Sequence, residues 1–132
     1  MNKLFGTITQ IQKSGSIMLV DVDVDGHSFS ALLIESATSL QWLQAGNIIQ
    51  MVFKETEVSL AKNLSGKISM RNRMNCIVQQ VECGGLLSKI TLQFKQYIII
   101  SAITTRAVDS LQISIGDAIE ALVKSNEITL MK

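Results

Sequence analysis

Apolar and polar residues alternate along most of this 132-residue chain, with the period of two that is typical of half-buried β-strands. The clearest run is Ile17–Asp25, in which valines at positions 20, 22 and 24 alternate with aspartates at positions 21, 23 and 25. Asp25 and Gly26 then form a pair that is typical of a tight hairpin turn. His27–Ile34 is expected to return as the next strand, so the pattern predicts an all-β chain.

The same pattern occurs twice along the chain. Residues 3–62 align without a gap on residues 73–132 when they are shifted by 70 positions. Glycine falls on glycine at positions 15 and 85 and at positions 46 and 116, and lysine falls on lysine at positions 54 and 124. Such a repeat decides the fold assignment. It predicts two modules, residues 1–64 and 65–132, of which the first has a degenerate opening.

Each module is expected to contain five strands and one short helix. The strands are expected at Leu4–Ile11, Ile17–Asp25, His27–Ile34, Ile48–Lys54 and Val58–Ala61, and again at Met74–Val81, Leu87–Lys95, Tyr97–Ile103, Ile119–Lys124 and Ile128–Met131. The helices are expected from Ser36, ending near Gly46, and at Thr105–Leu111. This order is typical of a small OB-like β-barrel. Tyr97–Ile103 is apolar on both faces, which predicts a central strand or one covered by a partner.

Composition excludes several classes of function. A net charge of +1 and an aromatic content of 5% argue against a nucleic-acid surface or a base-stacking platform. No apolar run approaches the roughly 20 residues that cross a bilayer, and the N-terminus has no targeting pattern. We therefore expect a cytoplasmic protein without nucleic-acid or membrane partners. Cys76 and Cys83 are not spaced as a metal or redox pair and are expected to be apolar fillers.

Three other features are weak as sites. Residues 21–26 open like a calcium loop, but Leu32 stands where the closing glutamate is needed, and the alternating valines require a strand. His27 has no metal-ligand or triad partners in the sequence, so it is expected on the surface at a turn. Gly84 and Gly85 could present N–H groups to an anion, although a turn is the simpler interpretation. We expect no enzymatic activity.

The remaining chemistry is concentrated at residues 68–73, near the middle of the chain. Ser69 and Arg71 are two residues apart, so on an extended backbone their side chains point to the same side. Arginine keeps its charge, and its fork of N–H donors suits oxyanions. A hydroxyl beside a guanidinium therefore predicts half of an anion site.

Further candidate donors stand at strand ends. Lys54 and Lys124 are equivalent in the repeat, and Ser125 follows Lys124, so the second of these turns offers an ammonium, a hydroxyl and backbone N–H groups. Thr104 and Thr105 offer hydroxyls at the start of the expected helix, where anions are favoured. Polar residues are also common as caps and at strand ends, so none of these groups identifies a site alone.

The segment Ser69-Met70-Arg71-Asn72, with the strand after it, resembles the Ser-Ala-Arg-Asn opening of the Mop (molbindin) family of TOBE-type domains. The resemblance continues from Ala102 to Leu130, and the repeat extends it more weakly over residues 3–62, so that the whole chain resembles a di-Mop protein. It implies tandem OB-like five-stranded barrels that bind molybdate, and also tungstate, at module or subunit interfaces. It also implies a homotrimer that stores or buffers the oxyanion in the cytoplasm.

The resemblance also implies which residues bind the oxyanion. The expected ligands are Ser69, Arg71, Asn72, Thr104, Lys124 and Ser125. From the first module it implies Lys54 and, if the helix start shifts by one residue, Ser36. Met70 replaces a small residue of the family pattern, and Ala107 stands where many relatives have another serine. The chain starts too late to carry a first-module serine and arginine, so fewer sites are expected than in a relative with two complete openings.

Two alternatives belong to other classes. One is an OB-type module for protein or nucleic-acid interaction that has no role in anion binding. The other is a molybdate-responsive regulatory module that passes its ligand state to a partner. Low aromatic content and near-neutral charge count against the nucleic-acid form of the first. Regulators of the second kind usually carry an additional DNA-binding segment.

Overall fold

The computed structural model describes residues 1–34 and 41–132. The first half contains β1 (Asn2–Ser14), β2 (Ile17–Val24), β3 (His27–Ile34), β4 (Ile48–Phe53), the 3-10 turn η1 (Glu55–Glu57) and β5 (Ser59–Ala61). The second half contains β6 (Asn72–Cys83), β7 (Leu87–Phe94), β8 (Tyr97–Thr104), α1 (Thr105–Leu111), β9 (Ala118–Val123), η2 (Ser125–Glu127) and β10 (Thr129–Met131). The prediction of an all-β chain with two five-stranded units is confirmed.

The helix expected in the second module is present as α1. The Thr104 hydroxyl caps its first turn by accepting a hydrogen bond from the backbone N–H of Ala107 at 3.1 Å. The helix ends where Gln112 adopts a left-handed backbone conformation. The equivalent helix expected from Ser36 falls largely on residues 35–40, which lie outside the described residues, and residues 41–47 form turns without a helix.

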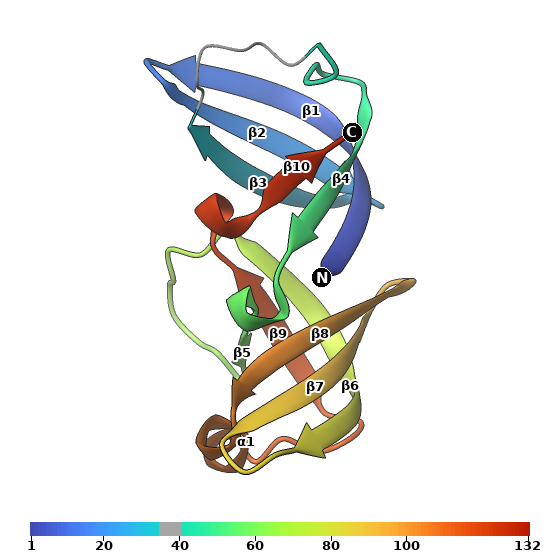
Figure 1. Ribbon diagram of the computed structural model, residues 1–132, viewed down its shortest axis with the longest axis vertical. Coiled ribbons are helices and arrows are strands. Elements are labelled where there is room, and N and C mark those ends of the chain that lie inside the picture. Colours follow the sequence, from blue (N-terminus) through green and yellow to red (C-terminus); the bar gives the residue numbers. More distant parts are fainter. Residues whose placement is uncertain (35–40) are drawn as a thin grey trace.

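The two sheets exchange their last strands. Their strand orders are β10-β4-β1-β2-β3 and β5-β9-β6-β7-β8. The C-terminal strand β10 therefore pairs with β4, and β5 from the first half pairs with β9 (Figure 1). Neither half completes its sheet with its own residues. The boundary at residue 64 divides the sequence repeat but not the sheets, and as a domain boundary it stays a prediction.

The long strands β1 and β6 bend at the same position of the repeat. Each has a bulge, between Ile8 and Gln10 in β1 and between Val78 and Gln80 in β6. The N–H of Gly46 donates to the carbonyl of Ile8 at 2.7 Å, and the N–H of Gly116 donates to the carbonyl of Val78 at 2.8 Å. A bulge increases the local twist, so it curls each sheet around its core.

Two buried asparagines join the halves of the chain. The Asn72 amide, which is 0% exposed, accepts from the N–H of Ser30 at 2.8 Å and donates to the carbonyls of Ser30 at 2.9 Å and Val123 at 3.1 Å. Asn2, 70 positions earlier, donates to the carbonyl of Ile100 and accepts from its N–H, both at 2.8 Å. Each amide thus satisfies backbone groups on an edge strand of the opposite sheet.

Strand β8 is an edge strand, so its predicted central position is wrong. The other half of the same chain covers this edge. The Tyr97 hydroxyl donates to the carbonyl of Phe5 at 3.3 Å, and the Ser101 hydroxyl donates to the carbonyl of Val58 at 2.7 Å. Contact between the halves therefore covers β8 only in part, and Ile98 on this strand stays 52% exposed.

His27 and Cys83 are also corrected. His27 was expected at the surface but is half-buried, with its ring 4.9 Å from that of Phe29 and 5.4 Å from that of Phe94. Its Nε2 lies 2.7 Å from the carbonyl oxygen of Arg73, so it contributes to the joint between the halves. Cys83 was expected as a filler and is exposed, whereas Cys76 is buried as expected.

Replacing Asn72 with alanine should destabilise the fold strongly. The change leaves an N–H and two carbonyls without their partner at a buried position, which is expected to lower the free energy of unfolding by about 2–4 kcal/mol. Denaturant unfolding at a fixed protein concentration measures the loss. Asn75→Ala, at an exposed position of the same strand, is the control and should change stability by less than about 0.5 kcal/mol. Equal losses in the two variants would contradict the assigned role of Asn72.

Candidate functional site

Ser69 and Arg71 lie in the segment that leads into β6. Strand β6 begins only at Asn72, so the extended strand expected to carry both side chains starts after them. Both residues are exposed, while Met70 between them is half-buried. The side chain of Met70 is thus partly directed away from solvent, as expected for a residue between two exposed neighbours. The hydrogen bonds of the Asn72 amide hold this segment against β3.

Arg71 and Lys124 come together because β6 and β9 are antiparallel. Asn72 pairs with Val123, so the residue before Asn72 and the residue after Val123 stand at the same end of the sheet. Lys124 is exposed and extended and begins η2. Within the described ranges, neither Arg71 nor Lys124 forms an ion pair. Two cationic residues therefore stand at the same end of the sheet, a setting that attracts an anion.

Ser125 adds a hydroxyl to this group. Its Oγ lies 3.5 Å from the Oγ of Ser30, because η2 packs against β3 of the first half. We call the place where the Ser69–Asn72 segment, Lys124 and Ser125 meet β3 the Arg71 seam. Hydroxyl, guanidinium and ammonium groups are the donors that an oxyanion needs.

Asn72 belongs to the Arg71 seam but has no side-chain donor to spare. Both of its amide N–H groups already donate to backbone carbonyls. In this chain its amide positions the segment that carries Ser69 and Arg71. Its expected role as a direct ligand stays a prediction.

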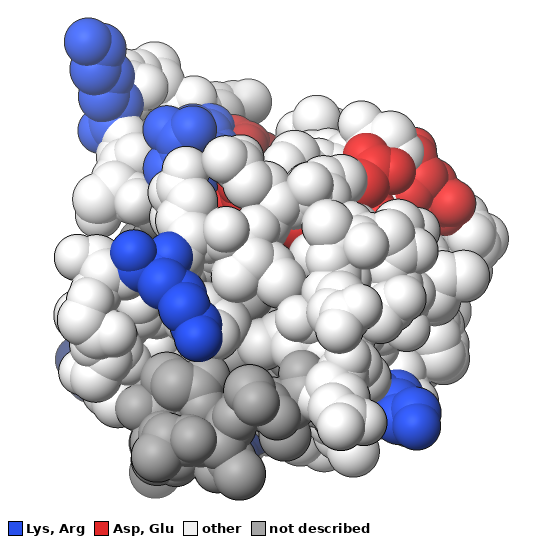
Figure 2. Space-filling view, turned by 90° about the horizontal axis from the view of Figure 1, so that it is seen from above, with Lys and Arg blue, Asp and Glu red and all other residues white. Residues whose placement is uncertain are grey.

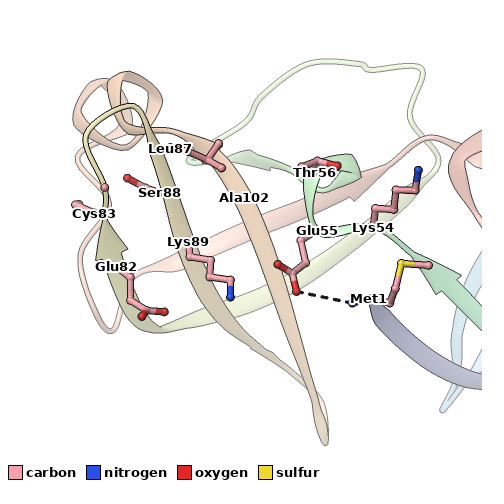
Figure 3. Close-up of a pocket in the computed structure, with 11 residues that line it drawn as sticks. Met1, Lys54, Glu55, Thr56, Glu82, Cys83, Leu87, Ser88, Lys89 and Ala102 are labelled. Atoms are coloured by element: carbon pink, nitrogen blue, oxygen red, sulfur yellow. Dashed lines mark ion pairs between the residues drawn. The ribbon is translucent and has the colours of Figure 1, made fainter.

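Thr104, at the end of β8, lines a cavity of about 500 Å³ together with Gly85, Leu86, Thr105, Arg106 and Asp109. Lys54 lies elsewhere, on a second seam where β8 meets η1, and lines another cavity there. This cavity has a volume of about 730 Å³ (Figure 3) and is lined by Met1, Lys54, Glu55, Thr56, Glu82, Cys83, Gly84, Leu87, Ser88, Lys89 and Ala102. We call it the Lys54 cavity. A single chain therefore does not bring Thr104 to Arg71, and Ser36 lies outside the described residues.

The Gly84-Gly85 segment is a turn, and Thr105 is tied to it. The Thr105 hydroxyl donates to the carbonyl of Gly84 at 2.9 Å and lies 2.7 Å from the hydroxyl of Ser88. The backbone N–H of Thr105 donates to the carbonyl of Leu86. The hydroxyl and the backbone N–H of Thr105 thus already form hydrogen bonds within the fold.

An ion pair that the sequence pattern did not predict stiffens β6 and β9. Nε and Nη2 of Arg73 each donate to a carboxylate oxygen of Glu120 at 2.8 Å. These bonds lower the pKa of Glu120 below its ordinary value. Nearby, the N–H of Ser114 and the ammonium of Lys62 lower the pKa of Asp117. Arg73 is therefore paired within the fold, unlike Arg71.

Other classes of site receive no support from the described residues. They contain no group of three or more His, Cys, Asp or Glu side chains that could hold a metal ion. No helix in the described part is long and apolar enough to span a bilayer. Figure 2, a view onto the upper end of Figure 1, shows basic side chains separated by wide uncharged surface, with acidic ones gathered elsewhere. This face does not present a continuous basic stripe for nucleic acid.

Known proteins share both the sequence pattern and the architecture of this chain. Residues 68–130 match the TOBE domain family. The structure of ModG, a cytoplasmic molybdate-binding protein solved with molybdate bound, aligns with a TM-score of 0.92 at 30% identity and covers 98% of this chain and 94% of ModG. The chain belongs to the Mop (molbindin) family of TOBE-domain proteins.

Two further relatives place this Mop chain among shorter and longer proteins. A molybdate-binding protein from Sporomusa ovata aligns with a TM-score of 0.50 at 34% identity and covers 51% of this chain and 100% of that protein. The molybdenum import ATP-binding protein ModC of Brucella abortus and Brucella suis is 30% identical over 108 residues, which is 81% of this chain. This Mop chain spans 28% of the length of these curated relatives.

The stability of this Mop chain should depend on the ionisation of Glu120. Because its pKa is lower in the folded state, its contribution is present above the ordinary glutamate pKa of about 4.3 and is lost as pH falls through the lowered value. Glu120→Gln should therefore be less stable than the parent above about pH 5, and the two should converge below about pH 3. Urea unfolding across this range measures the difference. A gap that does not depend on pH would contradict the ion-pair explanation.

Proposed function

We propose that this Mop-family chain binds molybdate, and also tungstate, at the Arg71 seam. The observation that carries the proposal is the convergence of Arg71, Lys124 and Ser125 at one end of β6 and β9. A tetrahedral dianion needs two positive charges and several hydrogen-bond donors, and this group supplies both. ModG and the Sporomusa ovata protein, which share the architecture, are molybdate-binding proteins.

The expected affinity follows from the donor set. Charge-assisted hydrogen bonds contribute about 1.5–3 kcal/mol each. Four or five of them from Ser69, Arg71, Lys124, Ser125 and neighbouring N–H groups are sufficient for about micromolar affinity after the costs of binding. Both cations are exposed in the free chain, so binding does not have to break an existing ion pair among the described residues.

The site is completed by a second copy of the chain. Thr104 lines a cavity that contains neither Arg71 nor Lys124, so it reaches an anion at Arg71 only from a neighbouring subunit. A homotrimer would bring Thr104 to the Arg71 seam and would bury apolar side chains that are now exposed, such as Ile34, Ile98 and Leu87. The oxyanion sites are therefore proposed at subunit interfaces.

The biological role that fits this chain is cytoplasmic storage or homeostasis of molybdenum, without enzymatic activity. The alignment with ModG, a cytoplasmic protein, covers 98% of this chain and therefore includes both halves. The described residues offer hydrogen-bond donors and positive charge at the Arg71 seam, which suit reversible binding of an anion. Binding and release of the anion is the chemistry that such a site can perform.

Replacing Arg71 with alanine should weaken molybdate binding by at least about 100-fold, because it removes a bidentate, charge-assisted contact. Isothermal titration calorimetry with molybdate, tungstate, sulfate and phosphate measures the affinities. Arg106→Ala removes the same charge from an exposed position on α1 and is the matched control. Unchanged molybdate affinity in Arg71→Ala would reject the Arg71 seam. Failure of the parent protein to bind any of the four anions would leave the interaction-module alternative.

Lys124→Ala separates ligand binding from assembly. Its ammonium is exposed and forms no ion pair among the described residues, so the variant should keep the solution mass of the parent and bind molybdate about tenfold or more weakly. Light scattering gives the mass and calorimetry gives the affinity. A variant that falls apart into single chains would show that Lys124 acts in assembly instead.

A further inference from the structure

The repeat places a second lysine turn beside the Lys54 cavity, with the same backbone as the turn at Lys124. Lys54 has φ −76° and ψ 152°, and Lys124 has φ −69° and ψ 144°. Each lysine carbonyl accepts from the N–H three residues later at 3.0 Å, from Glu57 and from Glu127. Since the two turns have the same shape, differences between the two seams must come from side chains.

The residue after the lysine differs in charge between the two turns. Ser125 follows Lys124 and brings a hydroxyl to the Arg71 seam, whereas Glu55 follows Lys54 and brings a carboxylate. The acid two positions further on, Glu57 or Glu127, is common to both turns. Glu55 is therefore the acidic residue that distinguishes the first turn from the second.

The Glu55 carboxylate is directed to the place that corresponds to Arg71. Its Oε2 lies 3.8 Å from the amino group of Met1, and Met1 is 70 positions before Arg71. Figure 3 shows Glu55 turned toward Met1, while the ammonium of Lys54 extends to the other side of the turn. The Glu55 side chain is 29% exposed, so its charge is partly shielded from water. A negative charge thus already stands at the position where the Arg71 seam is open to an anion.

Positive groups outnumber negative ones in the Lys54 cavity. The amino group of Met1, Lys54 and Lys89 contribute three positive charges, and Glu55 and Glu82 contribute two negative ones, of which Glu55 pairs with the amino group of Met1. Glu82 stands opposite Lys89 in the register of β6 and β7, and Glu55 is the acidic residue directly next to Lys54 along the chain. A doubly charged anion that approached this cavity would have to compete with the Glu55 carboxylate for the positive groups.

We propose that Glu55 is a specificity residue whose carboxylate acts as a fixed internal anion and closes the Lys54 cavity to tetrahedral oxyanions. The inference rests on the proposed function, because it extends the comparison of the Arg71 seam to the equivalent position of the first half. Loss of the carboxylate opens a second oxyanion site at the Lys54 cavity. The turn itself does not require Glu55, since Ser125 occupies the same position in an equivalent turn.

The test transfers the second-half residue into the first half. Glu55→Ser should increase the molybdate bound per chain, measured by equilibrium dialysis with elemental analysis of molybdenum. The added component should persist in the double variant Glu55→Ser with Arg71→Ala, which lacks the first site. Glu82→Gln removes the same charge from another wall of the Lys54 cavity and should add no molybdate. Unfolding midpoints and solution masses equal to those of the parent verify that each variant is folded and assembled.

The reciprocal variant keeps the inference falsifiable if Glu55→Ser does not fold. Ser125→Glu places the carboxylate in the Arg71 seam and should weaken molybdate binding there by at least about tenfold. Ser125→Ala, which removes only the hydroxyl, should weaken it less. Equal losses in Ser125→Glu and Ser125→Ala would overturn the proposed action of the carboxylate.

The possible failures are distinguishable. If the parent binds molybdate in an Arg71-dependent manner but Glu55→Ser adds none, the inference is wrong and the proposed function stands. If Glu82→Gln adds as much molybdate as Glu55→Ser, then loss of any negative charge from the cavity is sufficient, and the specific role of Glu55 is rejected. If the parent binds no oxyanion at all, the proposed function itself fails.

Discussion

Hydrogen bonding between the two halves of the chain is the constraint on which the rest of the structure depends. The edges of β4 and β9 expose backbone groups that need partners, and the strands that pair with them, β10 and β5, come from the opposite half. Each exchanged strand has only three residues, too few to be stable without the sheet that receives it. The halves must therefore fold together, and the buried amides of Asn2 and Asn72 extend the same pairing to β8 and β3. Both seams exist because of this exchange.

Pairing within the second half and packing between the halves together form the Arg71 seam. Antiparallel pairing of Asn72 with Val123 sets Arg71 beside Lys124, and packing of η2 against β3 adds Ser125. Two like charges at one place raise the energy of the free protein modestly, because both side chains are exposed to water. The proposed dianion would remove that repulsion, so we expect ligand binding to increase stability. The fold thus holds in place a charge arrangement that the proposed anion would relieve.

The periodicity of the sequence predicted the strands, the α1 helix and the equivalence of the two halves, since these depend on local patterns. It did not predict contacts between the halves, and the errors are concentrated there. β8 is an edge strand that the other half covers in part, and His27 is half-buried because it meets Arg73. The ion pair of Arg73 with Glu120, which lies within the second half, joins residues that are 47 positions apart. The site residues followed from the resemblance to the family. Their division between two seams required the sheet pairing.

Because the two halves share a backbone, they can differ in chemistry at little structural cost. The first position of each 3-10 turn is only partly buried, and the turn is closed by backbone groups that do not depend on its side chain. A glutamate or a serine can therefore occupy this position without changing the fold. This turn residue directly follows the lysine that both halves share, Lys54 or Lys124. Its charge therefore acts directly on any anion that the lysine attracts. In a duplicated chain, a single turn residue thus gives the two seams different charge while the backbone stays the same.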